Sequence, residues 1–332
     1  MIGPKILVIT PVHHIGGVTN ILESAGEVTY LDNPTPEEVR QRIGHFEALY
    51  TNPNMSNVYI SKDLIDAGEG LKIICTASTG TNHIDVDYAA QRDVTVLSLK
   101  EERQVINRIS STAEHAFALM MASLRHIVPA WESVKRGEWE YLPYIGRQLD
   151  HLTIGIVGYG RLGRLFAGYC KAFNSRVLVH DPYAVVEDTQ LQQVGLTELF
   201  KESDAVSLHV HVTLETTGMV NKKLLTHAKS DLVLINTSRG EICDEDALIG
   251  FLKSHPSATY ATDVLSAETL SKDANKMRAW ALNTRQVLIT PHIGGMTVEG
   301  QRIAYVRAAE RLSQHLASLT LDSSGGALRG QQ

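Results

Sequence analysis

Short apolar runs alternate with amphipathic segments along most of the chain. The runs are brief and rich in valine and isoleucine, which favours strands over helices. Between them, apolar residues recur at the spacing of a helix face. Because strands joined through helices lie parallel, the alternation predicts parallel sheets covered by helices. The predicted strands lie near residues 5–9, 48–50, 72–76, 94–97, 154–157, 177–179, 205–208, 232–235, 259–263 and 287–290.

The helices of the first part are expected near residues 18–25, 36–46, 61–69 and 85–92. The second of them begins at Thr35–Glu38, where a threonine cap, a proline and a glutamate follow the order of a capping box. Further on, apolar positions at helical spacing predict one long helix over 110–135 and another over 297–316. The small polar residues from Asp322 onward predict a frayed end.

Glycines follow one of the predicted strands at the spacing of a phosphate-binding turn. The segment Gly158-Tyr159-Gly160-Arg161-Leu162-Gly163 connects the strand 154–157 to a predicted helix. In a dinucleotide-binding βαβ unit, such glycines permit a tight turn, close approach of a pyrophosphate and close packing of helix on strand. Asp181 ends the next strand, eighteen residues beyond Gly163, where an acidic side chain binds the adenosine ribose. The alternatives are an ordinary strand–turn–helix corner and a plain turn aspartate before Pro182.

Composition narrows the classes of function. A chain of 332 residues exceeds what one hydrophobic core usually supports, so two domains are expected, with a crossing near residues 100–110. The net charge of −6 and the lack of a basic block argue against nucleic acid as a partner. No apolar run approaches the ~20 residues of a membrane span, and Lys5–Ile9 is too short for a signal peptide. Three dispersed cysteines, of which Cys75 and Cys170 lie in apolar surroundings, favour the reducing cytoplasm.

Polar side chains follow three later strands of the predicted cofactor domain. Arg239 follows the strand 232–235, Glu268 lies just beyond the strand 259–263, and His292 follows the strand 287–290. Taken singly, an arginine, glutamate or histidine in such a loop more often has a structural role or faces solvent than takes part in a functional site. Ligands of such sheets bind at the carboxyl edge, which makes the set a candidate site.

These residue types suit hydride transfer at a carbon that bears oxygen. The planar fork of arginine grips a carboxylate, and histidine gives and takes protons near neutral pH. A glutamate on the second ring nitrogen would orient the ring and favour its charged form.

Several motifs together resemble those of the D-isomer-specific 2-hydroxyacid dehydrogenase family, from about Ile73 to Ala308. The motifs are STGTNHID at 78–85, STAEHAFALMMASLR at 111–125, VGYGRLG at 157–163, NTSRG at 236–240, TDV followed by Glu268 at 262–268, and TPHIGG at 290–295. The resemblance implies an α/β protein of two doubly wound parallel-sheet domains. A Rossmann NAD domain (106–296) would be inserted into a flavodoxin-like substrate domain (1–105 plus 297–332).

The family's site residues carry over onto these motifs. Arg239 would bind the substrate carboxylate, His292 would be the acid/base, and Glu268 would be its partner. Asp263 would contact the nicotinamide carboxamide. The expected NAD-binding residues are Gly158, Gly160, Arg161, Leu162, Gly163, Asp181, His209, Thr112, Thr237, Ser238, Asp263 and Gly294, and the expected substrate-binding residues are Ser78, Thr79, Gly80, Arg239 and His292.

The resemblance also implies the partners. They are NAD and a small 2-oxo or 2-hydroxy acid, with no metal, and a homodimer formed by segments near 110–150. Two other functions remain open. One is an NAD-binding corepressor-like or sensor protein without catalysis. The other is a sibling dehydrogenase that acts on a phosphonate or another oxyanion.

The chain also departs from the family pattern. Thr79 stands where phosphite dehydrogenases carry lysine, and the loop 78–85 has no arginine for a substrate phosphate. Both features disfavour phosphite and phosphoglycerate. His211 replaces a common proline. The roles of His211 and of four other polar residues are left open: His13, His14, Tyr144 and Arg147.

Overall fold

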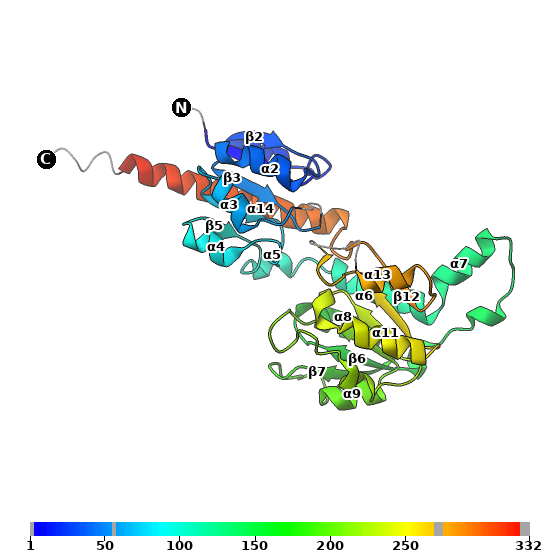
Figure 1. Cartoon of the computed structure of the whole chain (residues 1–332). Helices are drawn as coiled ribbons and strands as arrows, with labels where there is room; N and C mark the ends of the chain where they lie inside the picture. The colour runs from blue at the N-terminus through cyan, green and yellow to red at the C-terminus, as the bar shows by residue number, and fades with distance from the viewer. Residues whose placement is uncertain (1–2, 55–57, 269–274, 326–332) are drawn as a thin grey trace. The chain divides into compact units, whose positions relative to one another are not determined.

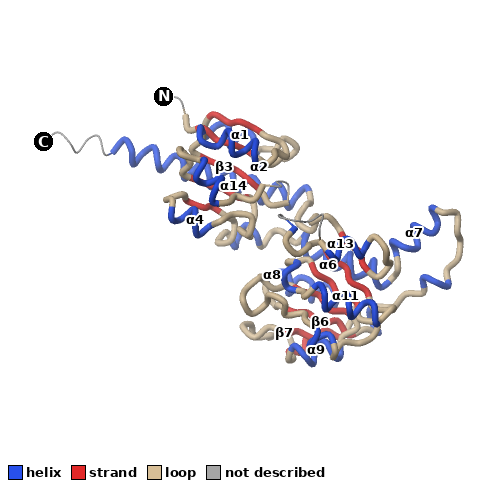
Figure 2. Tube along the Cα trace, viewed as in Figure 1, coloured by secondary structure: helices blue, strands red, loops and turns tan. Residues whose placement is uncertain are grey.

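The computed structural model describes residues 3–54, 58–268 and 275–325. The chain divides into two compact units. One unit comprises residues 1–109 and 296–332, and the other comprises residues 110–295. Each unit holds one sheet with helices on both faces (Figures 1 and 2). The predicted fold class, two doubly wound parallel-sheet domains, is therefore confirmed.

The first unit is built on a five-stranded parallel sheet of order β2-β1-β3-β4-β5. Alternate residues of each strand enter different cores: Ile6 packs towards α1 and α14, and Leu7 packs towards α2 and α3. The capping box predicted at Thr35 and Glu38 starts α2. The strands are β1 (Lys5–Val8), β2 (Glu27–Tyr30), β3 (Ala48–Thr51), β4 (Ile73–Thr76) and β5 (Thr95–Leu97). The α-helices are α1 (Val18–Ala25), α2 (Pro36–Arg42), α3 (Lys62–Ala67), α4 (Val86–Gln91), α5 (Arg103–Ile106) and α14 (Val298–Gly325).

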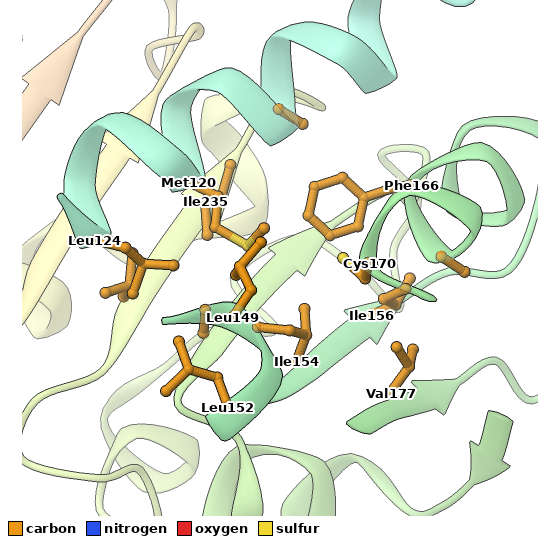
Figure 3. Close-up of a cluster of buried hydrophobic side chains, with 14 of the residues drawn as sticks. Met120, Leu124, Leu149, Leu152, Ile154, Ile156, Phe166, Cys170, Val177 and Ile235 are labelled. Atoms are coloured by element: carbon orange, nitrogen blue, oxygen red, sulfur yellow. The ribbon is translucent and has the colours of Figure 1, made fainter. Parts of the chain in front are cut away.

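The second unit has a seven-stranded parallel sheet of order β12-β11-β10-β9-β6-β7-β8. Figure 3 shows one of its cores, where Met120 and Phe166 from two helices face Ile154 and Ile156 of an inner strand. The strands are β6 (Thr153–Val157), β7 (Arg176–His180), β8 (Leu191–Gln193), β9 (Ala205–Leu208), β10 (Val233–Asn236), β11 (Thr259–Thr262) and β12 (Val287–Ile289). The α-helices are α6 (Ser111–Leu124), α7 (Ile127–Lys135), α8 (Arg161–Ala172), α9 (Leu196–Glu202), α10 (Lys222–Leu225), α11 (Glu245–Ser254) and α13 (Lys276–Ala281).

Three predictions about the elements were wrong. The segment 110–135 is not one helix, because α6 ends at Leu124 and His126 takes a left-handed φ of 50° before α7 begins. Pro129 explains the break, since its ring cannot follow an unbroken helical turn. The short edge strands β2 and β8 were missed because they lack a buried apolar run. Helix α14 continues to Gly325, past the predicted frayed end at Asp322, and residues 326–332 lie outside the described residues.

The three cysteines are free and buried. The apolar surroundings predicted for Cys75 and Cys170 are therefore confirmed. Burial raises the pKa of each thiol to about 12, so none is a reactive thiolate near neutral pH. None of the described helices combines the length and apolar character that a bilayer span requires.

Helix α7 and the residues that follow it stand clear of the sheet of their unit (Figure 1). We call residues 126–146 the arm. Its base is closed where the Arg147 N–H donates to the carbonyl of Leu124 at 3.1 Å. Arg147 also donates to Asp204 at 3.0 Å and to Asp231 at 3.1 Å, which assigns it a structural contact within its own unit.

Asp204 is the buried partner of Arg147 at the base of the arm, and its side chain is 9% exposed. Burial by itself would raise the pKa of Asp204. Its hydrogen bonds from Lys229, the Thr153 N–H and Arg147 outweigh burial and hold the pKa below its ordinary value. The charged form therefore stabilises the fold.

We expect Asp204→Asn to lower the free energy of unfolding by about 1–3 kcal/mol, because it removes the charge that these donors share. The Asp231→Asn variant is the control, since Asp231 is 46% exposed, and it should cost less than about 0.5 kcal/mol. Urea unfolding at neutral pH measures both. The contribution is complete above the unfolded-state pKa and is lost as the pH falls through the lower folded-state pKa. If the loss of unfolding free energy in Asp204→Asn, relative to the wild type, stays the same in acid, this account is contradicted.

Candidate active site

The glycine turn joins β6 to α8 at the carboxyl edge of the seven-stranded sheet. Gly158 has a φ of 93°, and a Cβ there would lie 2.6 Å from the carbonyl oxygen of His209. A Cβ on Gly163 would lie 2.0 Å from the carbonyl oxygen of Gly158, so helix and turn need bare backbone. By contrast, a Cβ on Gly160 would meet no atom within 4 Å. Gly160 therefore leaves open space beside the first turn of α8, as a bound pyrophosphate requires.

Asp181 lies at the end of β7 and supports this turn. Its Oδ2 accepts the N–H of Tyr159 at 2.7 Å, and its Oδ1 accepts the N–H groups of Tyr183 at 2.9 Å and Ala184 at 3.1 Å. An ionised carboxylate has about four acceptor positions. Asp181 thus orients the turn and retains acceptor capacity for a ribose hydroxyl.

His209 follows β9 on the other side of β6. Its Nε2 pairs with the Ser207 hydroxyl at 2.9 Å, and its ring packs against Phe166 with 5.0 Å between the centroids. Burial lowers the pKa of His209 to about 3, so its ring is neutral near pH 7. Within the described part of the chain, His209 Nδ1 and the Thr237 hydroxyl are buried polar atoms without a hydrogen-bond partner. Unpaired buried groups at this edge fit a site that a polar ligand completes.

Arg239 and Glu268 lie on loops that pack directly against each other. A Cβ on Gly240 would lie 2.1 Å from the Ser266 nitrogen, so only glycine permits this approach. The Ala267 N–H donates to Glu241 at 3.1 Å and holds the two loops together. The half-buried Arg239 donates to the carbonyl of Ser238 at 2.7 Å.

His292 and Glu268 form a direct pair. His292 Nδ1 hydrogen-bonds to Glu268 Oε1, and both side chains are about one-fifth exposed, at 21% and 23%. Glu268 Oε2 accepts the N–H of Leu265 at 3.2 Å, which orients the carboxylate. His292 has a φ of 56° and Ala267 a φ of 52°. Left-handed backbone at a residue other than glycine costs roughly 1–2 kcal/mol, and such strain gathers at functional sites.

Asp263 anchors the loop that carries His292. Its carboxylate is 2% exposed and accepts from the Thr290 hydroxyl at 2.5 Å, the Ile293 N–H at 2.8 Å and the Gly294 N–H at 2.7 Å. His115 of α6 lies 3.4 Å from the same carboxylate and pairs with Thr290 at 2.9 Å. Burial alone would raise the pKa of Asp263, but these donors outweigh it and lower the pKa.

Sequence reasoning missed His115, although it lies within the quoted segment 111–125. A histidine in an apolar helix stripe carries no local signal, because its partner is distant in sequence.

The remaining predicted residues are divided between the units. Arg161 and Leu162 open α8, and burial lowers the pKa of Arg161. The Ser238 hydroxyl donates to the carbonyl of Leu208 at 2.8 Å. Thr112 and His115 would both contact a Cβ on Gly294.

Ser78, Thr79 and Gly80 follow β4 in the first unit. There the Gly80 N–H donates to the Ser78 hydroxyl at 3.1 Å. Ser78 and Gly80 are half-buried, and the Thr79 side chain is exposed. Across the described ranges, no group of three or more His, Cys, Asp or Glu side chains is arranged to hold a metal ion.

The model of the D-isomer specific 2-hydroxyacid dehydrogenase NAD binding domain matches residues 117–294. A hydroxypyruvate reductase of Thermotoga maritima is 34% identical over 77% of this chain and 81% of that protein. A D-3-phosphoglycerate dehydrogenase of Synechocystis is 31% identical over 96% of this chain, which spans only 55% of that longer protein. The solved structure of D-lactate dehydrogenase from Aquifex aeolicus, complexed with NAD and lactic acid, is 25% identical. It aligns with a TM-score of 0.79 over 97% of this chain and 98% of that one.

The geometry of the glycine turn gives a paired prediction. Gly160→Ala should keep the free energy of unfolding near that of the wild type and weaken NADH binding roughly tenfold or more, because its methyl group fills only the ligand's space. Gly163→Ala should instead destabilise the fold by about 1–3 kcal/mol through the clash with Gly158. Urea unfolding and NADH fluorescence titration measure the two effects. Gly168→Ala is the control, because a Cβ on Gly168 in α8 also meets no atom within 4 Å. Equal NADH binding by the Gly160 and Gly168 variants would refute the prediction.

Proposed function

This chain belongs to the D-isomer-specific 2-hydroxyacid dehydrogenase family, whose cofactor is NAD, and we propose that it interconverts a small 2-oxo acid and its D-2-hydroxy acid. The observation that carries the proposal is the contact of His292 with Glu268 at the carboxyl edge of an NAD-binding sheet. The loop of Glu268 packs against the loop of Arg239. Bound NADH supplies the hydride for the carbonyl carbon.

His292 and Glu268 handle the proton of this reaction. Glu268 holds the Nδ1 of His292, and Nε2 is the nitrogen that donates a proton to the substrate oxygen in reduction and accepts it in oxidation. The carboxylate fixes the orientation of the ring through its contact with Nδ1. Asp263 keeps the His292 loop in place through the Ile293 and Gly294 N–H groups.

Arg239 and the loop after β4 bind the substrate in this proposal. The guanidinium grips the carboxylate and stabilises negative charge on the adjacent oxygen. The N–H groups around Ser78, Thr79 and Gly80 are the substrate-binding groups that we propose for the first unit. The relatives act, by their names, on hydroxypyruvate, lactate or phosphoglycerate. The loop 78–85 has no arginine that would bind a phosphate, and we therefore propose a substrate without a phosphate group.

Asp181 selects NAD over NADP in this proposal. Its carboxylate retains acceptor capacity for a ribose hydroxyl and repels a 2′-phosphate. Buried free thiols are typical of a reducing compartment, and we therefore propose a cytoplasmic enzyme.

The purified chain tests the proposal in a panel of 2-oxo acids with NADH or NADPH. Glyoxylate, pyruvate, hydroxypyruvate and 3-phosphohydroxypyruvate cover the carboxylates. Phosphite and a hydroxyphosphonate cover other oxyanions and, because they are oxidised, are assayed with NAD⁺ or NADP⁺ in place of the reduced cofactor. We expect NADH oxidation with a small 2-oxo acid. NADH binding without turnover of any member would favour a non-enzymatic NAD-dependent protein, and turnover confined to the other oxyanions would favour the sibling enzyme.

We expect His292→Asn to lower kcat for the best 2-oxo acid by roughly 10²–10⁴, because no proton donor replaces the ring. Asparagine is chosen because it tolerates the left-handed backbone of this residue. The NADH dissociation constant, measured by fluorescence, should stay within about twofold of the wild type. His227→Asn changes an exposed histidine and is the control. Near-wild-type turnover by the His292 variant would remove this residue from the mechanism.

The arm is the surface that we propose for a homodimer. Several of its apolar side chains are more than half exposed, among them Trp131 at 60%, Trp139 at 86% and Tyr141 at 76%. An apolar surface on a projecting segment is typical of a subunit interface. The occupant proposed is a second copy of this chain.

The double variant Trp131→Glu/Trp139→Glu should convert the dimer to a monomer, since burying two unpaired charges opposes association. Size-exclusion chromatography with light scattering gives the mass. Leu282→Glu introduces the same charge at an apolar residue that is 83% exposed outside the arm, and should leave the dimer intact. A wild-type monomer, or a dimer that survives the double change, contradicts the proposal.

A further inference from the structure

A side-chain contact links the loops that follow β7 and β9. The hydroxyl of Tyr183, two residues beyond Asp181, donates to a carboxylate oxygen of Glu215. Both side chains are exposed, and neither belongs to a motif singled out in the sequence.

The order of the strands places this contact over the dinucleotide site. β6 lies between β7 and β9, and all three strands run parallel, so their following loops leave the same edge of the sheet. A contact between the β7 loop and the β9 loop therefore spans the carboxyl end of β6, where the glycine turn begins. Backbone hydrogen bonds join the roots of these loops: the Gly158 N–H donates to His180 at 2.8 Å, and the His209 N–H donates to Val157 at 2.7 Å.

The loop that carries Glu215 is held by its own threonines. The Thr216 hydroxyl donates to the carbonyl of His211 at 2.6 Å, and the Thr213 N–H donates to the Thr216 hydroxyl at 2.8 Å. At its far end, the Gly218 N–H donates to the carbonyl of Glu241 at 2.8 Å. These bonds organise the loop around Glu215, which presents the carboxylate to Tyr183.

Two carboxylates thus lie next to Tyr183. Asp181 accepts its backbone N–H at 2.9 Å, and Glu215 accepts its hydroxyl. The hydrogen bond to Glu215 and the charges of Glu215 and Asp181 raise the pKa of the Tyr183 hydroxyl. The segments 181–188 and 209–217 contain no lysine or arginine that would neutralise them.

We propose that Glu215, held by Tyr183, is a second specificity-determining carboxylate that disfavours the 2′-phosphate of NADP. The inference rests on the proposed NAD site, because it concerns the adenosine half of that site. A 2′-phosphate adds about −1.5 to −2 charge near pH 7, and Glu215 repels this charge in addition to Asp181. Asp181 by itself therefore does not account for the whole cofactor preference.

Direct binding of NADH and NADPH to the purified full chain, measured by fluorescence titration, tests the inference without turnover. Glu215→Gln removes the charge but keeps an oxygen that accepts from Tyr183. We expect it to shift the ratio of the NADPH and NADH dissociation constants roughly tenfold towards NADPH, and less at high salt, where charge effects are screened. Glu187→Gln removes the same charge from the exposed β7 loop and should leave the ratio unchanged.

Tyr183→Phe separates the contact from the charge, because it removes only the hydroxyl that holds Glu215. This variant should shift the ratio in the same direction by a smaller factor, and combining it with Glu215→Gln should add little to the shift of Glu215→Gln alone. If the Glu215→Gln variant binds NADH as the wild type does and its ratio of NADPH to NADH dissociation constants is unchanged, the role of Glu215 is overturned. The proposed function is then unaffected. A wild-type chain that binds neither nucleotide overturns this inference and the proposed function together.

Discussion

The parallel direction of the second sheet is the constraint on which the candidate site depends. Since every strand ends at the same edge, loops from separate parts of the sequence emerge side by side. Gly158 then contacts the backbone of His209, and Gly240 contacts the Leu265–Ser266 backbone, at distances that no Cβ permits. These close approaches set the arrangement of the polar side chains. A methyl group at either glycine would separate the loops before it changed any chemistry.

Buried carboxylates fix loops at both edges of this sheet. Asp263 binds the Thr290 hydroxyl and two backbone N–H groups of the loop that carries His292, with His115 of α6 beside it. Asp204 does the same for the base of the arm. In both cases burial opposes the charge and the surrounding donors prevail, so the carboxylate stabilises one loop geometry. The position of His292 therefore depends on a carboxylate of another loop.

Local patterns predicted the regular elements well where burial is high. The central strands were predicted close to their observed bounds, because their apolar runs are buried on both faces. The capping box at Thr35 and Glu38 was found for the same local reason. The edge strands β2 and β8 were missed, since half-exposed strands have no such run. The apolar stripe through Leu124 and Ile127 concealed the break between α6 and α7, although Pro129 signalled it.

By itself the sequence determined the parallel α/β class, the glycine turn and the residue types able to bind NAD and exchange a proton, because each is written in neighbouring residues. The family resemblance had already offered Glu268 as the partner of His292, and the structure brings the two side chains into contact. Only the tertiary structure decided that His115 and Thr290 meet at Asp263 and that Tyr183 reaches Glu215. The physical reason is that side-chain pairing depends on strand order and on loop conformations such as the positive φ of His292. Strand order and loop conformation are set by packing across the whole unit, and they produce no periodic pattern in the sequence.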